Sequence, residues 1–104
     1  MTRHAFKMKL RPGMAAEYQR RHDAIWPDLA AALRSAGVSD YSIFLDEETL
    51  TLFAVQKLGA GHTSAALPDL PVVRQWWEDM APLMETHPDH SPVVGPLREV
   101  FHLD

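Results

Sequence analysis

Hydrophobic and polar positions alternate with a period of two in several short stretches of the chain. In the first stretch, residues 4–10, every second side chain falls on one side: His4, Phe6, Met8 and Leu10. This period is typical of a half-buried strand. Residues 38–46 and 49–57 repeat the pattern on either side of a polar turn, which predicts an antiparallel hairpin.

Two helical regions separate these strands, and prolines interrupt both. The first covers residues 14–24. Pro27 has no backbone N–H and its ring clashes with the preceding turn, so the helix is expected to break just before it and to restart with Pro27 as its first residue. The restarted helix covers residues 28–36 and ends at Gly37, a residue suited to a helix C-terminus. The second region is expected to be helical over residues 72–84.

The last stretch, residues 97–104, is expected to form a fourth strand, with Val100 on one side and its sequence neighbours Glu99 and Phe101 on the other. The element order is then β-α-β-β-α-β. It predicts one α+β domain over residues 1–104, a ferredoxin-like four-stranded antiparallel sheet with helices on one face. The other face still carries apolar side chains, and a C2 homodimer packed sheet against sheet would cover them. Residues 97–103 can then reach the partner subunit.

Composition and charge narrow the classes of function. Hydrophobic residues make up 46% of the 104 residues, which indicates a globular domain. The chain has no cysteine, which excludes disulfides, cysteine nucleophiles and cysteine-based zinc sites and leads us to expect a cytoplasmic protein. We expect neither a signal segment nor a membrane span, because charges interrupt the first residues and no apolar run is long enough. A net charge of −4 and scattered Lys and Arg residues argue against nucleic-acid binding.

The segment EYQRRHDAIWPDL, residues 17–29, carries the first candidate chemistry. Tyr18 and His22 are four residues apart and lie side by side on one helix face, and apolar residues extend this line toward the sheet. Histidine can donate and accept protons near neutral pH, and a tyrosine hydroxyl beside it can donate or accept a hydrogen bond. The same two residues would also fit a core in which each is hydrogen-bonded to the backbone. The spacing leaves both interpretations open.

Three further aromatic residues are candidates. Trp76 and Trp77 are neighbours in a helix, about 100° apart around its axis, so one is expected to pack in the core while the other lines a cleft. They would equally serve only to anchor the helix. An aromatic wall with indole N–H groups suits a sugar, which has an apolar C–H face and a ring of hydroxyls. Tyr41 shares the phase of Ile43 and Leu45, and either enters the space between sheet and helices or lies on the surface.

Six histidines raise the question of a metal site. His87 and His90 are three residues apart, whereas His62 and His102 are isolated, and no HExxH or paired-ligand spacing occurs. We therefore expect no metal.

Taken together, these motifs resemble one family. The segments EYQRRH, IWPDL and RQWW, the tyrosine at position 41 followed by SIFLD, and the closing PDHSPV and LREVFHLD are similar to L-rhamnose mutarotases. The similarity extends over nearly the whole chain in one register. It implies a ferredoxin-like fold, a homodimer with a dimeric α/β-barrel-type assembly, and interconversion of the α and β anomers of L-rhamnose in rhamnose metabolism, without cofactor or metal.

The resemblance also implies roles for single residues. It implies that His22 is the catalytic residue and that the sugar is bound by Tyr18, Tyr41, Trp76 and Trp77. Mutarotation opens the pyranose ring, turns the C1 carbonyl over and recloses the ring on the other face. We expect His22 to donate a proton to the ring oxygen and to recover it on closure. The second proton could be handled by Tyr18, by Tyr41 or by a bound water.

The chain departs from the family pattern in two places. A loop that is PDNSP-like in the family has His90 at its centre here, and residues 58–71 are richer in glycine and proline than expected. Either change would alter substrate preference if it touches the sugar.

Two other functions fit the same fold. Small dimeric ferredoxin-like proteins include haem-degrading monooxygenases, so a histidine facing the cleft could ligate haem iron. A non-catalytic sugar-binding module would bind the sugar and be stabilised by it without changing the rate of anomer exchange.

Overall fold

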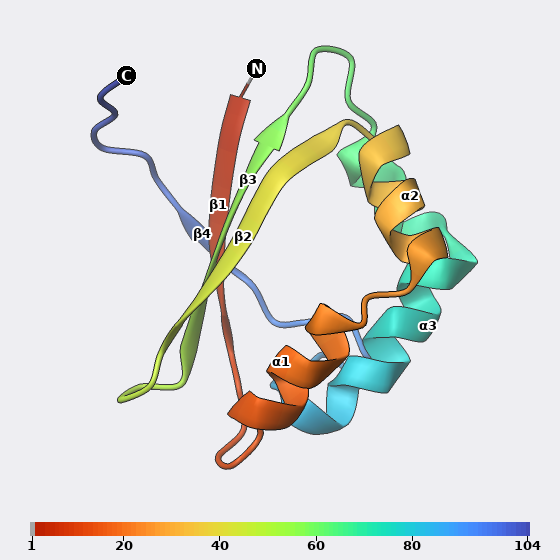
Figure 1. Cartoon of the computed structure of the whole chain (residues 1–104), viewed down its shortest axis with the longest axis vertical. Helices are drawn as coiled ribbons and strands as arrows, with labels where there is room; N and C mark the ends of the chain where they lie inside the picture. The colour runs from red at the N-terminus through yellow and green to blue at the C-terminus, as the bar shows by residue number, and fades with distance from the viewer. Residues whose placement is uncertain (1) are drawn as a thin grey trace.

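The chain folds into a four-stranded antiparallel sheet with its helices on one face (Figure 1). The computed structural model describes residues 2–104. The strands are β1 (Thr2–Lys9), β2 (Val38–Asp46), β3 (Thr51–Leu58) and β4 (Gly95–Leu97). The helices are α1 (Ala15–Asp23), α2 (Pro27–Ser35) and α3 (Pro71–Met80), with short 3₁₀ helices η1 (Ser64–Asp69) and η2 (Ala81–Leu83).

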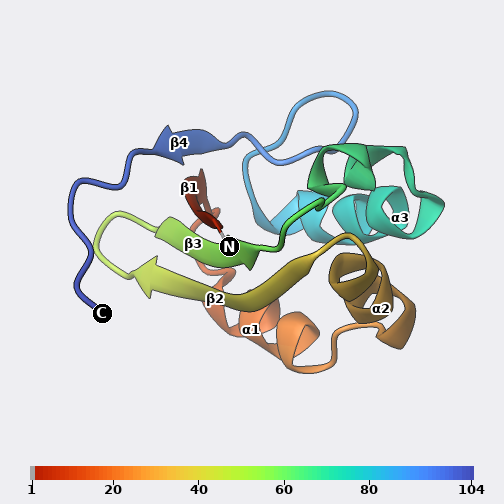
Figure 2. The same ribbon diagram turned by 90° about the horizontal axis from the view of Figure 1, so that it is seen from above.

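The order of the strands in space is β2-β3-β1-β4, which Figure 2 shows from above. All three pairs of neighbouring strands are antiparallel. Each helical region therefore connects two strands that are not adjacent to each other, which is the split β-α-β arrangement. The ferredoxin-like α+β fold predicted from the hydrophobic pattern is confirmed.

Prolines decide where the helices begin and end. Trp26 is extended, with φ −62° and ψ 131°, and Pro27 is the first residue of α2, as expected. The helix predicted over residues 72–84 is shorter, because α3 ends at Met80 and a 3₁₀ turn containing Pro82 follows. Pro82 cannot donate the backbone hydrogen bond that a continued α-helix needs. Within residues 2–104, no helix has the length and apolarity of a membrane span.

The fourth strand was predicted over residues 97–104, and this prediction is wrong. β4 is Gly95–Leu97 and pairs with Ala5, Phe6 and Lys7 of β1, after which the chain leaves the sheet on the side opposite to the helices (Figure 1). A strand needs a neighbouring strand to satisfy its backbone, and alternation of apolar residues alone does not provide one. The apolar side chains of this segment are largely exposed, at 77–79%: Val100, Phe101 and Leu103.

The core lies between the sheet and the helices. Leu10 and Leu52 are its most buried large side chains, each 2% exposed. The rest of the core comes from the helix-facing side of the sheet and from the sheet-facing sides of the three helices. Its members include Met8, Ala54, Tyr18, Leu29, Val73, Trp76 and Met80. The candidate residues Tyr18 and Trp76 therefore belong to the same packed layer that holds the helices on the sheet.

Candidate functional site

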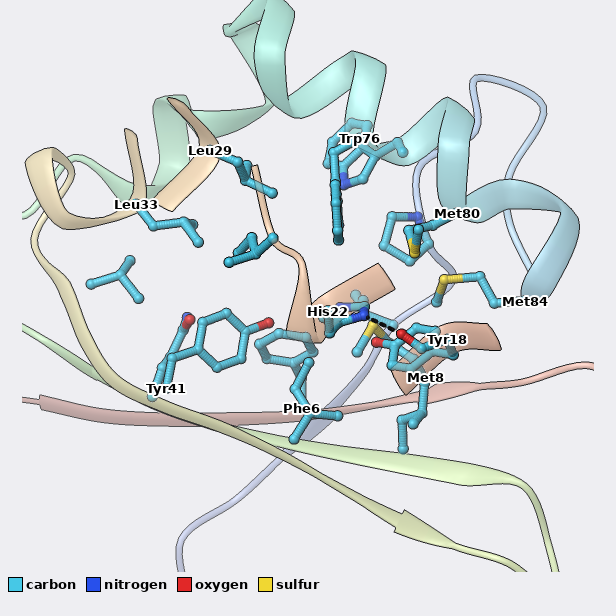
Figure 3. Close-up of a pocket in the computed structure, with 18 of the residues that line it drawn as sticks. Phe6, Met8, Tyr18, His22, Leu29, Leu33, Tyr41, Trp76, Met80 and Met84 are labelled. Atoms are coloured by element: carbon cyan, nitrogen blue, oxygen red, sulfur yellow. Dashed lines mark hydrogen bonds between the residues drawn. The ribbon is translucent and has the colours of Figure 1, made fainter. Parts of the chain in front are cut away.

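A cleft of about 1750 Å³ opens between the sheet and the helices (Figure 3). It exceeds the roughly 300–1,000 Å³ that most small-molecule sites have. All five candidate site residues line it: Tyr18, His22, Tyr41, Trp76 and Trp77. The topology thus brings together residues from α1, β2 and α3 that are far apart in the sequence.

Tyr18 and His22 lie in contact on α1, with ring centroids 4.1 Å apart. The Nδ1 atom of His22 lies 2.9 Å from the backbone carbonyl oxygen of Tyr18. A carbonyl oxygen only accepts, so Nδ1 carries the proton and Nε2 is the free acceptor when the ring is neutral. Burial lowers the pKa of His22 below its usual 6.5, although the hydrogen bond to Tyr18 partly opposes this. At neutral pH the ring is therefore neutral, with an unprotonated Nε2.

The hydroxyl of Tyr18 reaches the open part of the cleft. Among the described residues it makes no hydrogen bond, and no fully buried side-chain polar atom in this part of the chain lacks a partner. The oxygen must therefore contact open space, although the residue is buried as a whole. Burial and, to a smaller extent, Tyr41 raise the pKa of Tyr18. The hydroxyl therefore keeps its proton and is available as a hydrogen-bond donor.

The two tryptophans of α3 differ in burial. Trp76 is 8% exposed and packs edge-on against both His22 and Trp26, at centroid distances of 5.2 and 5.0 Å. Trp77 is half-buried. The expectation that one would pack in the core while the other lines a cleft holds only in part, because Trp76 does both. Its indole is wide enough to complete the core with one edge and to face the cleft with the other.

Tyr41 lies on the cleft side of β2, in a bulge of the strand. Ser39 pairs with Lys57 and Ser42 with Val55, so two residues of β2 face Gln56 alone. Tyr41 is in phase with Ile43 on the helix-facing side, as its spacing predicted, and the extra residue reverses the alternation so that Val38 shares this side as well. Its hydroxyl points across the cleft toward His22 (Figure 3). Burial raises the pKa of Tyr41 to about 12, although 38% of the residue is exposed.

An arginine fastens the helix that carries His22. Arg21 donates from Nε to Glu17 at 2.6 Å within α1, and from a terminal nitrogen to the backbone carbonyl oxygen of Asp79 on α3 at 2.5 Å. Its second contact with Asp79 is an ion pair with the carboxylate at 3.5 Å. Arg20 and Arg21 together lower the pKa of Glu17 to about 2. α1 and α3, the two helices of the site, are thus joined next to His22.

Three residues at the site were not predicted from the sequence. Trp26 packs edge-on against Trp76, and the ring of Phe6 on β1 packs edge-on against Tyr41, with centroids 6.5 Å apart. Gln56 is a buried amide on the cleft side of β3. The sequence could have indicated Gln56, because it is a polar residue at a position of the strand where alternation predicts an apolar one.

The comparisons with known proteins agree with this geometry. A family model described as L-rhamnose mutarotase matches residues 3–103. The chain belongs to the L-rhamnose mutarotase family. It is 57% identical over 103 residues to the L-rhamnose mutarotase of Acidiphilium cryptum, covering 99% of both chains. It is also 57% identical over 103 residues to that of Rhizobium johnstonii, covering 99% of this chain and 97% of the relative.

A solved member of the L-rhamnose mutarotase family has the same fold. The crystal structure of L-rhamnose mutarotase from Formosa agariphila superimposes with a TM-score of 0.93 at 48% sequence identity, and covers 100% of both chains. The whole domain, and not only the motifs around the cleft, is therefore shared with this family member.

The two segments that depart from the family pattern occupy different places. The 3₁₀ helix η1, within residues 58–71, lines the cleft through Ser64, Leu67 and Pro68. His90 instead lies in an exposed turn with a positive φ of 71°, and its Nδ1 is 4.0 Å from a carboxylate oxygen of Glu78. Residues 58–71 thus contribute η1 to the site wall, whereas the loop at residues 88–92 reaches the cleft through Pro92 and not through His90.

Proposed function

We propose that this protein is an isomerase that interconverts the α and β anomers of L-rhamnose. The observation that supports this most directly is the contact of Tyr18, His22 and Trp76 at one cleft, in a chain that belongs to the L-rhamnose mutarotase family. A histidine with one fixed and one free nitrogen can transfer a proton, and aromatic walls suit the C–H face of a pyranose. We further propose that the protein works in the cytoplasm, in rhamnose metabolism.

The reaction needs two proton movements and no redox change. When the ring opens, the C1–O5 bond breaks, the anomeric hydroxyl loses its proton and O5 gains one. When the ring closes on the other face of the carbonyl, O5 loses a proton and O1 gains one. The two oxygens are both bonded to C1, so one positioned group can serve both of them. General acid–base catalysis of this kind contributes about 10²–10⁴-fold in rate.

We propose that His22 carries this proton. The neutral resting ring first accepts the proton of the anomeric hydroxyl at Nε2 and then, as imidazolium, donates it to O5 as the C1–O5 bond breaks. Closure reverses both transfers. The Nδ1–H stays on the carbonyl oxygen of Tyr18 throughout, which keeps Nε2 aimed at the cleft. The donation to the ring oxygen expected from the sequence is then the second half of a shuttle.

The other candidate residues would hold the sugar around His22. Tyr18 and Tyr41 both have raised pKa values, so they keep their protons and donate hydrogen bonds to sugar oxygens. Trp76 and Trp77, which both line the cleft, would cover the apolar face of the ring and its methyl group from the helix side. Either tyrosine, or a water bound to one, would donate a hydrogen bond to whichever of O1 and O5 is not in contact with His22.

The decisive experiment measures anomer exchange of L-rhamnose at equilibrium by saturation-transfer NMR. Wild type is expected to accelerate exchange, His22→Ala to lose most of that acceleration, and His87→Ala, which changes an exposed histidine, to keep it. Exchange accelerated equally by His22→Ala would move the proton transfer to another residue. A folded wild type that binds the sugar without accelerating exchange would instead be a sugar-binding module.

We also propose that the protein is a homodimer joined through the outer face of the sheet. This face carries exposed apolar side chains on neighbouring strands, with Phe44 62% exposed and Phe53 and Val55 each 36%. The segment after β4 leaves the sheet on the same side and carries further exposed apolar residues, Val100, Phe101 and Leu103 (Figure 1). A second copy packed against this face would cover both.

A further inference from the structure

A row of three polar side chains crosses the cleft side of the sheet. His4 of β1 pairs in register with Gln56 of β3, and Tyr41 lies in the bulge of β2 that faces Gln56. All three line the cleft. The next row on the same side is apolar and consists of Phe6, Ala54 and Ile43.

Gln56 is out of place in a strand that otherwise packs apolar residues on this side. It is 7% exposed, and the other buried residues on the helix-facing side of β3 are Leu52, Ala54 and Leu58. Burial of an amide costs free energy unless its polar atoms are hydrogen-bonded. Packing alone would favour a fourth apolar residue at this position. The presence of an amide there is therefore not explained by packing and indicates a role in binding a ligand.

The hydrogen bonding of Gln56 leaves half of its amide free. Its Nε2 lies 2.9 Å from Nδ1 of His4. An amide nitrogen only donates, so Nδ1 accepts and the orientation of the amide is set. Within residues 2–104, this is the one hydrogen bond that the Gln56 side chain makes, yet no fully buried side-chain polar atom there lacks a partner. The carbonyl oxygen of Gln56 therefore contacts open space, and the space in front of it is the cleft.

We infer that Gln56 binds two neighbouring hydroxyl groups of the sugar and that His4 is a positioning residue for it. The second N–H donates to one hydroxyl oxygen, and the carbonyl oxygen accepts from the next hydroxyl. The inference rests on the proposed function and adds a determinant of substrate class, a pyranose with adjacent free hydroxyls. The amide binds it from the sheet side, while the tryptophans cover it from the helix side.

The first test replaces the amide by an apolar side chain of similar length. Gln56→Met is expected to raise KM for anomer exchange about tenfold, because two hydrogen bonds are lost, and to change kcat by less than about threefold. Gln75→Met makes the same change at an exposed position of α3 and should leave both constants unchanged. An unchanged KM in folded Gln56→Met would overturn the inference.

Deoxy sugars identify the hydroxyls and separate binding from folding. A sugar that lacks a hydroxyl bound by Gln56 should have a raised KM with wild type and no additional penalty with Gln56→Met. His4→Phe should raise KM by a smaller factor with kcat kept, because the amide loses its orientation and not its hydrogen-bonding groups. Equal penalties for every deoxy sugar in wild type and Gln56→Met would contradict the role of Gln56.

A third measurement uses the wild-type protein alone, so it does not depend on a variant that folds. The side-chain amide resonances of Gln56 should shift when L-rhamnose is added, whereas those of Gln75 should not. If the protein accelerates exchange but neither amide resonance shifts, the inference is overturned and the proposed function stands. Failure of wild type to accelerate exchange would overturn the proposed function itself.

Discussion

The two nitrogens of His22 have different tasks, and this difference sets the expected pH dependence. Nδ1 is held by the carbonyl oxygen of Tyr18, so proton transfer is left to Nε2. Burial disfavours the charged imidazolium, which loses hydration between α1 and Trp76, and this lowers the pKa of His22. The resting form that can accept a proton is therefore the dominant form at neutral pH.

The enzymatic rate of exchange should therefore be flat near neutral pH and fall in acid. As the pH drops through the lowered pKa of His22, below 6.5, Nε2 becomes protonated and kcat/KM declines. The measurement is the exchange rate between about pH 5 and pH 8, with the buffer-catalysed rate subtracted at each point. A rate that rises steadily as the pH falls across this range would show that the imidazolium is the resting form.

The unequal burial of the two tryptophans predicts unequal effects on stability. Trp77→Ala should raise KM several-fold through the loss of contact with the sugar, with a small change in melting temperature. Trp76→Ala should raise KM and also reduce the free energy of unfolding by about 3–5 kcal/mol, because the indole fills space against Trp26 and His22. Urea unfolding and exchange kinetics on the two variants check this. Equal destabilisation would contradict the assignment of Trp76 to the core.

At the scale of elements, α1 depends on its neighbours for its position. It has nine residues, and a helix of that length is marginal on its own. Tyr18 buries one side of it, and Arg21 joins its last turn to Asp79 at the end of α3. Because His22 follows Arg21 directly, the same link sets the distance of the imidazole from Trp76.

Arg21→Met and Arg20→Met form a matched pair that tests this link. Both arginines contact Glu17, but only Arg21 reaches α3, and the side chain of Arg20 is 68% exposed. Arg21→Met should reduce kcat about tenfold or more through displacement of His22. Arg20→Met should stay within about twofold of wild type, because an exposed ion pair contributes little. If both variants retain wild-type kcat, the link does not position His22.

At the scale of the molecule, the two faces of the sheet have separate roles. One face builds the core and the cleft, and the other presents apolar side chains to its surroundings. The segment after β4 is tied to this second side by an ion pair of 2.9 Å between Glu99 and Arg3. The proposed dimer interface is therefore continuous from β2 to the C-terminal segment.

Phe44→Glu should dissociate the proposed homodimer. A carboxylate within a sheet-to-sheet interface would be buried without a partner, which is strongly unfavourable. Light scattering coupled to size-exclusion chromatography should give a dimer for wild type and a monomer for Phe44→Glu. Gln75→Glu introduces the same charge on α3 and should remain a dimer. A monomeric wild type would rule out the proposed assembly.

Much of the fold and part of the site could be predicted without coordinates. The break before Pro27, and the end of α2 at Ser35 shortly before Gly37 with its φ of 90°, depend on the backbone chemistry of single residues. The contact of Tyr18 with His22 depends only on helical spacing. The alternating strands, and the order of strands and helices along the chain, follow from hydrophobic periodicity, which can be read from short stretches of sequence.

The remaining features depend on segments that are distant in the sequence. Local alternation predicted a last strand that continues to residue 104, but the pairing of this segment with β1 stops at Leu97. The bulge that puts Val38 on the same side as Tyr41 exists because β2 has one residue more than β3 between two paired positions. The same register places Gln56 opposite His4. The sequence by itself thus determined the elements and the chemistry each one carries, whereas the tertiary structure decided which of these groups meet, because strand register and helix docking are set by non-local partners.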